Sequence, residues 1–147
     1  MQAVFEECED YFVLTTGGSA TPAAAHSLYI QLPEGKSYED KHILGICNAE
    51  TGRLVDVIDV ILGYPKPDII TLGLFLIAPE YSSSISKKTY NVLEQWVRDQ
   101  GCAIIQVSVY EESGNDTSFW NSLDFGATGQ ISQNGNHTVV ICQKCLL

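Results

Sequence analysis

Basic residues are scarce in this sequence. Its 147 residues include 8 Lys and Arg against 18 Asp and Glu, which gives a formal net charge of −10. An acidic surface repels nucleic acid and anionic membranes and attracts cationic ligands. We therefore expect neither nucleic acid nor a membrane among the partners, and a small-molecule amine would suit the charge. The acidity is explained equally well as an aid to solubility.

Long hydrophobic runs are also missing. No apolar run reaches the roughly 18–20 residues that cross a bilayer. The N-terminal stretch MQAVFEECEDYF has neither the basic start nor the apolar run of a signal peptide. We expect a soluble, cytoplasmic protein, in which the Asn-x-Thr triplets at Asn115 and Asn136 carry no sugar.

Cysteines are few and odd in number, which makes a poor disulfide framework. Cys142 and Cys145 form a CxxC pair, but the segment around them has the pattern of a strand, where residues three apart face opposite ways. The three His residues show no ligand spacing with any acid or cysteine. We therefore expect no metal site and assign the cysteines to packing or to the surface.

Apolar residues are plentiful, at 45% of the chain, and support one domain over 1–147 with a core. Residues 1–40 predict two helices. The first has apolar side chains at helical spacing from Val4 to Phe12, and the second opens at Thr21 as N-cap and Pro22 as first helical residue. Residues 41–147 predict a sheet and the core around it.

Six strands and two further helices are expected beyond residue 40. The strands are predicted at 41–48, 53–62, 69–77, 102–110, 126–133 and 137–144, and the helices at 86–100 and 115–123. Gly52 and Gly135 mark two hairpin turns. Because a helix joins the third strand to the fourth, this pair is expected to be parallel, with a right-handed crossover. The fold class is α/β (α+β), with a mixed, mostly antiparallel sheet.

Two stretches carry a family resemblance. IAPEYSSSISKKTYNVLEQWVRDQG, residues 77–101, combines a strand end, a short polar loop and an amphipathic helix, and NDTSFWNSLDF follows the next strand. In order and spacing they resemble the GNAT superfamily of acyl-CoA N-acyltransferases, from about His42 to Lys144. The residues that match that family's Asn-x-x-x-Phe-(Tyr or Trp)-x-x-Leu-Gly-Phe helix are Asn115, Phe119, Trp120, Leu123 and Phe125.

The resemblance implies a sheet with helices on both faces, whose parallel pair splays apart to hold acetyl-CoA. Backbone at Leu76 and Ile77 would meet the thioester oxygen and the pantetheine amides. Asn115 would contact the cofactor or, alternatively, cap its own helix. The residues expected to hold the pyrophosphate are Ser82, Ser83, Ser84, Ile85, Ser86 and Lys87.

Three features depart from the family pattern. Serines stand where the family's turn has Arg/Gln-Gly-x-Gly-Ile-Gly, and the turn is one residue shorter. Asp124 replaces the glycine before Phe125. No strand precedes the first helix, so the sheet would lack an edge strand, and this open edge could pair with a second copy in a homodimer.

The missing glycines and arginine remove two contributions to cofactor binding but leave the main-chain contribution in place. Main-chain N–H groups at a helix start bind phosphate whatever side chains they carry. A positive φ at a residue other than glycine, however, costs on the order of 1–2 kcal/mol, and a lost charged contact about 1.5–3 kcal/mol. We expect acyl-CoA affinity to be weakened roughly 10- to 1,000-fold unless Lys87, Lys88 or a reshaped turn compensates. A serine-capped helix without cofactor is the other interpretation.

Catalysis would need a group to accept the amine proton and an acid for the leaving thiolate. The family's usual acid is a tyrosine at the position of Trp120, and an indole N–H does not give up its proton at neutral pH. Tyr110 and Glu111, at the end of the strand 102–110, are the candidates that remain. Glu111 could accept the proton, or it could be a solvated loop carboxylate.

Two carboxylates interrupt the apolar strand 53–62. Asp56 and Asp59 are three residues apart, so they should lie on opposite faces. We expect one to point to solvent, while the other could line the acceptor pocket. The sequence thus predicts an acetyl-CoA-dependent N-acyltransferase for a small-molecule or peptide amine. The alternative is a non-catalytic GNAT-like module that binds a ligand or a protein.

Overall fold

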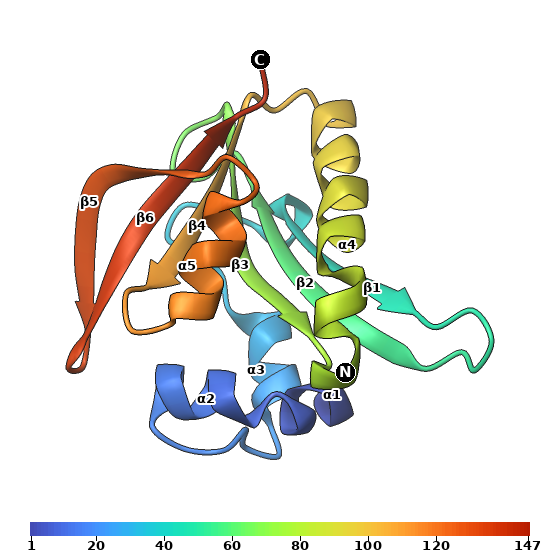
Figure 1. Cartoon of the computed structure of the whole chain (residues 1–147). Coiled ribbons are helices and arrows are strands. Elements are labelled where there is room, and N and C mark those ends of the chain that lie inside the picture. Colours follow the sequence, from blue (N-terminus) through green and yellow to red (C-terminus); the bar gives the residue numbers. More distant parts are fainter.

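The computed structural model describes residues 1–147 and has six strands in one sheet, with helices on both faces (Figure 1). The strands are β1 (Lys41–Cys47), β2 (Leu54–Leu62), β3 (Ile69–Ile77), β4 (Ile104–Tyr110), β5 (Gly126–Asn134) and β6 (His137–Cys145). The helices are α1 (Gln2–Glu7), α2 (Glu9–Thr16), α3 (Ala24–Ile30), α4 (Pro79–Asp99) and α5 (Gly114–Asn121), with a short 3₁₀ turn at Tyr38–Asp40.

The sheet has the order β1-β2-β3-β4-β6-β5. Every predicted strand is present, with ends within two residues of the prediction. Gly52 and Gly135 have positive φ values of 69° and 62°, as the predicted hairpin turns require. The parallel pairing of β3 with β4 is confirmed, and all other pairs are antiparallel.

Two hydrophobic layers lie on the two faces of the sheet. On one face, α4 and α5 cover the core, in which Tyr90 and Ile105 are fully buried. On the other face, α1 packs Val4 and Phe5, and α2 packs Phe12, against β2 and β3. Helices therefore cover β2 and β3 on both sides, which explains the nearly continuous apolar sequences of these strands.

The N-terminal helices differ from the prediction. The single helix expected from Val4 to Phe12 is broken at Cys8, whose φ of −92° and ψ of 47° are not helical. The break lets both short helices pack on one cluster, where the rings of Phe5 and Phe12 are 5.3 Å apart. Thr21 is not an N-cap, because α3 begins after Ala23.

The most consequential correction concerns α4. The segment 78–85, expected as a loop before a helix from Ser86, is helical from Pro79 onward. Proline's fixed φ suits the first helical position. The N–H of Ala78 is held by the Val55 carbonyl at 2.8 Å, and the Ala78 carbonyl accepts a hydrogen bond from the Tyr81 N–H at 2.9 Å. The helix therefore starts as soon as β3 ends.

The other short helix also starts earlier than expected. Ser113 is the N-cap of α5, so Asn115 lies inside the first turn and is not the cap. The alternative role that the sequence left open for Asn115, capping this helix, is therefore wrong.

The prediction that Asp56 or Asp59 points to solvent is also wrong. Both are buried, with exposed fractions of 0% and 6%. They do lie on opposite faces, but each face of β2 is covered. Asp56 lies beside Thr89 of α4, whereas Asp59 forms an ion pair with Lys41, with 2.8 Å between Oδ1 and Nζ.

The sheet has two open edges. β1 forms one edge, and β5, the opposite edge, is exposed along its whole length. None of the helices combines the length and the hydropathy that crossing a bilayer would require.

Candidate active site

A cleft opens where β3 and β4 part. The two strands pair only between residues 69–72 and residues 104–107, at the start of each strand. Beyond that point they diverge toward their carboxyl ends, and α2 lies across the opening (Figure 1). The cavity measures about 1000 Å³. This volume is enough for a ligand of cofactor or drug size.

The β3 side of the cleft contains a bulge. Asp59 pairs with Leu74 and Val60 with Leu72, so Gly73 is the extra residue in β3. A Cβ atom on Gly73 would lie 2.6 Å from Asp59 Oδ2, so this position has no room for a side chain. Past the bulge, β3 has no partner strand on its cleft side.

Leu76 and Ile77, the predicted backbone contacts, line the cleft. The Cys8 thiol donates a hydrogen bond to the Ile77 carbonyl at 3.3 Å, which directs this oxygen toward α1. Burial, followed by the charges of Glu7 and Asp56, raises the pKa of Cys8 to about 11, so this cysteine stays a thiol at neutral pH.

Aromatic side chains form the wall on the α5 side. Trp120 packs edge-on against Phe75 and Phe125, with ring centroids 5.4 and 5.0 Å apart. Phe119 stacks on Phe75 at 5.8 Å. Trp120 is 8% exposed and still lines the cleft, so it combines core packing with a surface that faces the cavity.

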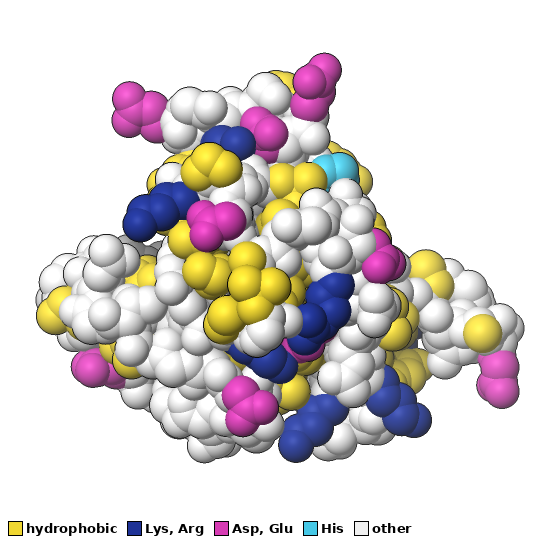
Figure 2. Space-filling view, turned by 90° about the horizontal axis from the view of Figure 1, so that it is seen from above, with side chains coloured by type: hydrophobic (Ala, Val, Ile, Leu, Met, Phe, Trp, Pro, Cys, Tyr) yellow, Lys and Arg dark blue, Asp and Glu magenta, His cyan; other side chains and the backbone are white.

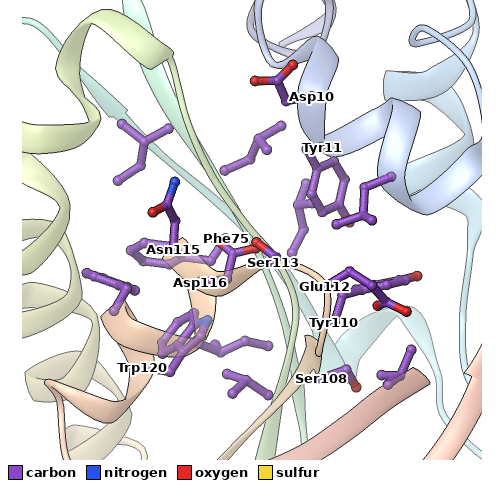
Figure 3. Close-up of a pocket in the computed structure, with 18 of the residues that line it drawn as sticks. Asp10, Tyr11, Phe75, Ser108, Tyr110, Glu112, Ser113, Asn115, Asp116 and Trp120 are labelled. Atoms are coloured by element: carbon purple, nitrogen blue, oxygen red, sulfur yellow. The ribbon is translucent and has the colours of Figure 1, made fainter. Parts of the chain in front are cut away.

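The end of the cleft near α2 is acidic. Asp10 and Tyr11 project from α2, and Glu112 and Asp116 follow β4 (Figure 3). Burial, with the nearby Tyr110 and Asp116 as smaller causes, raises the pKa of Tyr11 to about 12. Its phenol therefore stays protonated and can donate a hydrogen bond.

The predicted base, Glu111, and the glutamate that lines the cleft differ by one residue. Glu111 is exposed and does not line the cleft, whereas Glu112 does. Hydrogen bonds from its own backbone N–H and from the Thr138 N–H, together with His137 Nδ1 at 3.4 Å, lower the pKa of Glu112. Tyr110 lines the cleft, and its hydroxyl accepts a hydrogen bond from Asn134 at 2.6 Å.

The predicted pyrophosphate residues are divided by the helix. Ser82, Ser83 and Ser86 face the cleft from one side of α4, and Asn115 faces it from α5. The other three residues of that prediction do not line the cleft: Ser84, Ile85 and Lys87.

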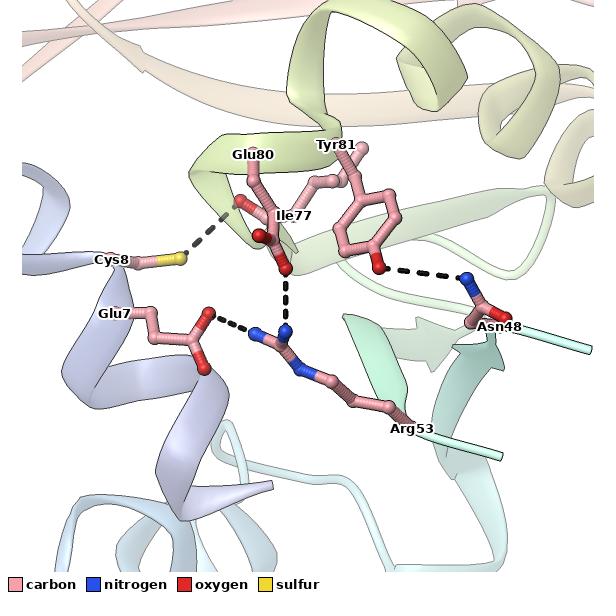
Figure 4. A network of polar contacts seen from close by, with 7 residues as sticks. All are labelled: Glu7, Cys8, Asn48, Arg53, Ile77, Glu80 and Tyr81. Atoms are coloured by element: carbon pink, nitrogen blue, oxygen red, sulfur yellow. Dashed lines mark hydrogen bonds and ion pairs between the residues drawn. The ribbon is translucent and has the colours of Figure 1, made fainter. Parts of the chain in front are cut away.

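The first turn of α4 is tied to α1 and to the β1–β2 turn (Figure 4). Arg53 donates to both Glu80 and Glu7, and Tyr81 accepts a hydrogen bond from Asn48 at 3.5 Å. These ion pairs are half exposed, so each contributes little stability by itself. They do place a carboxylate and an arginine of the protein at the positive end of the helix.

Basic side chains are absent from the cleft. None of its lining residues is Lys or Arg. Basic residues do occur at the far end of the molecule, where Arg98 bonds to the Leu146 carbonyl and Lys144 pairs with Glu94. Figure 2 shows that end, with Lys and Arg side chains interspersed with acidic ones around a hydrophobic group. The cleft therefore favours a cationic ligand group over an anionic one.

The lining residues that the sequence did not reveal include those of the acidic end: Asp10, Tyr11, Glu112 and Asp116. The first two belong to a short helix whose position depends on the break at Cys8. Glu112 was one residue away from the prediction, and only the turn after β4 decides which of two adjacent glutamates enters the cleft.

Comparison with known proteins shows the fold. No protein-family model matches this chain, and no curated protein matches it in sequence. An acetyltransferase from Thermus thermophilus is similar in structure, with a TM-score of 0.71 and 19% identity, over 98% of this chain and 87% of that one. A protein from Desulfovibrio desulfuricans assigned to the GNAT family of acetyltransferases gives a TM-score of 0.70 at 13% identity, over 99% of this chain and 92% of that one.

A ribosomal-protein-S18-alanine N-acetyltransferase from Escherichia coli gives a TM-score of 0.62 at 13% identity, over 86% of this chain and 90% of that one. At such identities the similarity establishes the architecture. The chain has the GNAT fold, with its splayed parallel pair.

The resemblance of the sequence implies an acyl-CoA cofactor, and the cleft would fit one part of this molecule. The parted strands present unpaired main chain to an acyl-pantetheine arm. The start of α4 presents no open turn for the diphosphate, because residues 83–86 lie in an α-helix, whose N–H groups bond to carbonyls four residues back. The residues therefore fit the acyl-pantetheine arm and not the diphosphate.

Proposed function

We propose that this chain is an N-acyltransferase that takes an acyl group from a pantetheine thioester, acetyl-CoA being the first to test, and transfers it to the amine of a small molecule or peptide. The observation that carries the proposal is the divergence of β3 and β4 after Leu72 and Val107. The acetyltransferases that share the fold support the reaction class.

The bound thioester would supply the activated acyl group, and the chain would supply its position. Main chain of β3 beyond Gly73 lacks a strand partner on the cleft side, so its N–H groups are available to polarise a carbonyl oxygen. The aromatic wall around Trp120 gives the same space an apolar side. Holding two reactants together in this way accounts for much of such catalysis.

The acidic end of the cleft would hold the acceptor. Asp10, Glu112 and Asp116 attract a protonated amine. Because the pKa of Glu112 is lowered, its carboxylate is ionised at neutral pH and attracts the amine. As a weak base it would accept the proton only after the nitrogen has attacked the thioester carbonyl, when the N–H has become acidic. Glu112 therefore replaces Glu111 as the base in this proposal, and Tyr11 and Tyr110 remain as hydrogen-bonding partners.

Thermal unfolding with and without acetyl-CoA tests the proposal. A cofactor present at 100 times its dissociation constant stabilises the folded state by about 2.7 kcal/mol, which we expect to appear as a raised Tm. Bovine serum albumin, melted in parallel, controls for unspecific effects of the nucleotide. An unchanged Tm at millimolar acetyl-CoA and at millimolar S-acetylpantetheine would contradict the proposal.

Replacing Trp120 by tyrosine is expected to raise the rate of acyl transfer at least about tenfold. A phenol in the cleft can give a proton to the leaving thiolate, and a general acid contributes typically about 10²–10⁴-fold when well placed. The measurement is the initial rate of thiol release with a panel of small amines. Trp120→Phe is the matched control, because it changes the packing similarly without adding an acid. Equal rates in the two variants would contradict this role.

The fully formed start of α4 favours a second candidate, a non-catalytic module that binds an organic cation in the same cleft. In that case small amines would raise Tm, whereas no thioester would.

A homodimer through the open edge of β1 is compatible with either proposal. Sedimentation equilibrium of the wild type against a β1 variant, Ile43→Lys, would test it. An unchanged monomer mass in both proteins would exclude the dimer.

A further inference from the structure

The start of α4 offers few donors to an anion. The hydroxyls of Ser82 and Ser84 donate to the carbonyls of Pro79 and Tyr81, at 3.1 and 2.9 Å. The Ser86 hydroxyl donates to the Ser82 carbonyl. Among these serines, Ser83 alone has a hydroxyl without a hydrogen bond, and it faces the cleft. The serine hydroxyls that the sequence suggests as phosphate ligands therefore donate to carbonyls of the helix itself, Ser83 excepted.

The positive end of α4 is also unavailable. Glu80 lies in the first turn, where its carboxylate interacts favourably with the helix dipole. Arg53 bonds to Glu80 and Glu7 beside that end (Figure 4). The cleft touches the side of α4 through Ser82, Ser83 and Ser86, and not its N-terminal end.

The charges around this part of the cleft are unfavourable for phosphates. Asn115 and Asp116 of α5 both line the cleft (Figure 3), and no Lys or Arg does. An anionic diphosphate would therefore meet a carboxylate and neutral groups, without the charge-assisted hydrogen bonds that normally hold it.

Resting on the proposed function, we propose that the cleft recognises its acyl donor by the pantetheine arm and the thioester, and not by the nucleotide diphosphate. The substrate class is then pantetheine thioesters in general. An acyl-CoA then binds no more tightly than a neutral acyl-pantetheine, because its nucleotide and phosphates meet no complementary charge in the cleft.

The experiment compares two donors on the full-length protein. Dissociation constants for acetyl-CoA and for uncharged S-acetylpantetheine are measured by quenching of tryptophan fluorescence and by calorimetry. We expect the two constants to agree within about tenfold, whereas two charge-assisted phosphate contacts would favour acetyl-CoA by about 100-fold or more. The ratio should also change little between about 50 mM and 300 mM salt, because no ion pair to phosphate is screened.

Ser83→Arg provides a gain of function. This change adds a cation where the one unbonded serine faces the cleft, so it should tighten acetyl-CoA binding about tenfold and leave S-acetylpantetheine unchanged. Asn91→Arg adds the same charge to an exposed position of α4 away from the cleft, and it should alter neither constant. A Ser83→Gly, Ser84→Gly variant should not favour acetyl-CoA, because it adds no cation.

The outcomes separate this inference from the proposed function. Binding of both donors with similar constants supports both. Preference for acetyl-CoA by about 100-fold or more in the wild type overturns the inference and leaves the acyltransferase standing; hydrogen exchange would then be expected to show residues 79–86 unwinding around the diphosphate. If neither compound binds, both the inference and the acyltransferase proposal are wrong.

Discussion

Replacing Lys41 by methionine is expected to lower the free energy of unfolding by about 3–5 kcal/mol, the range found when one partner of a buried ion pair is removed. The side chains of Lys41 and Asp59 are 4% and 8% exposed, and Nζ lies 2.8 Å from Oδ1. Methionine keeps the length of the side chain but leaves Asp59 without a counter-charge. Chemical denaturation at about pH 7 measures the effect.

The double variant Lys41→Met, Asp59→Leu separates the lost pair from lost packing. Leucine has the same branching as aspartate, and apolar replacement of a whole buried pair is often neutral or stabilising. We therefore expect the double variant to recover most of the stability. A double variant as unstable as the single one would mean that packing at β1, and not the unpaired carboxylate, explains the loss.

The Lys41–Asp59 ion pair also lies next to the wall of the cleft. Asp59 Oδ2 lies close behind the bulge, where a Cβ on Gly73 would approach it to 2.6 Å. Burial raises the pKa of Asp59, although Lys41 acts in the opposite direction. Without Lys41, Asp59 has a further reason to take up a proton, so the cost of Lys41→Met should grow with pH. Ligand binding in the cleft of the double variant would show whether the ionised pair is needed to hold the bulge.

Replacing Asp56 by asparagine is expected to stabilise the protein more at high pH than at low pH. Asp56 is 0% exposed and neither of its oxygens makes a hydrogen bond. Burial raises its pKa to about 7 from 3.8, against a lowering influence of the neighbouring Thr89. One pKa unit corresponds to about 1.4 kcal/mol, so the fully ionised folded state carries a penalty of about 4 kcal/mol.

The direction of the pH dependence follows from the protons that Asp56 binds in the folded and unfolded states. Below pH 3.8 the carboxyl group is protonated in both the folded and the unfolded state, and no penalty exists. Between pH 3.8 and about 7 the unfolded chain loses the proton that the folded protein keeps, so stability falls as pH rises. Above about pH 7 both states are ionised, and the penalty stays constant.

Urea denaturation at about pH 5.5 and about pH 8.5 tests the prediction. The stability gained by Asp56→Asn should be about 2 kcal/mol larger at the higher pH, because asparagine does not titrate. Glu50→Gln, in the exposed β1–β2 turn, is the control and should act equally at both values. An Asp56→Asn effect that is independent of pH would show that this carboxyl group titrates normally in the folded protein.

Most strands could be predicted from the sequence because their cause is local. Stretches of seven to nine residues that are rich in Ile, Val and Leu and lie next to glycine or proline turns set β1, β2, β3 and β6. The parallel pair followed from one long helix between two buried strands, since a short turn cannot join parallel neighbours. The matched residues from Asn115 to Phe125 predicted the GNAT fold, which the solved structures share.

The start of α4 shows where this reasoning fails. Pro79 suits a first helical position, but the polar run after it has the composition of a loop, because serine bonds to nearby backbone in either state. The contacts of Ala78 with β2 and the packing of Tyr90 against Trp120 decide in favour of a continuous helix. Neither contact is visible within residues 77–101 alone.

The sequence by itself determined the sheet, its one parallel crossover and the aromatic side chains that fill its core, because these depend on periodicity and on neighbours in the chain. Tertiary structure alone decided which carboxylates enter the cleft, that both Asp56 and Asp59 are buried, and that the serines are helical. Each of these depends on an element distant in sequence: α2 brings Asp10, α4 covers Asp56, and Lys41 of β1 pairs with Asp59. Burial and electric field are set by everything packed around a group, and a one-dimensional pattern contains only part of that environment.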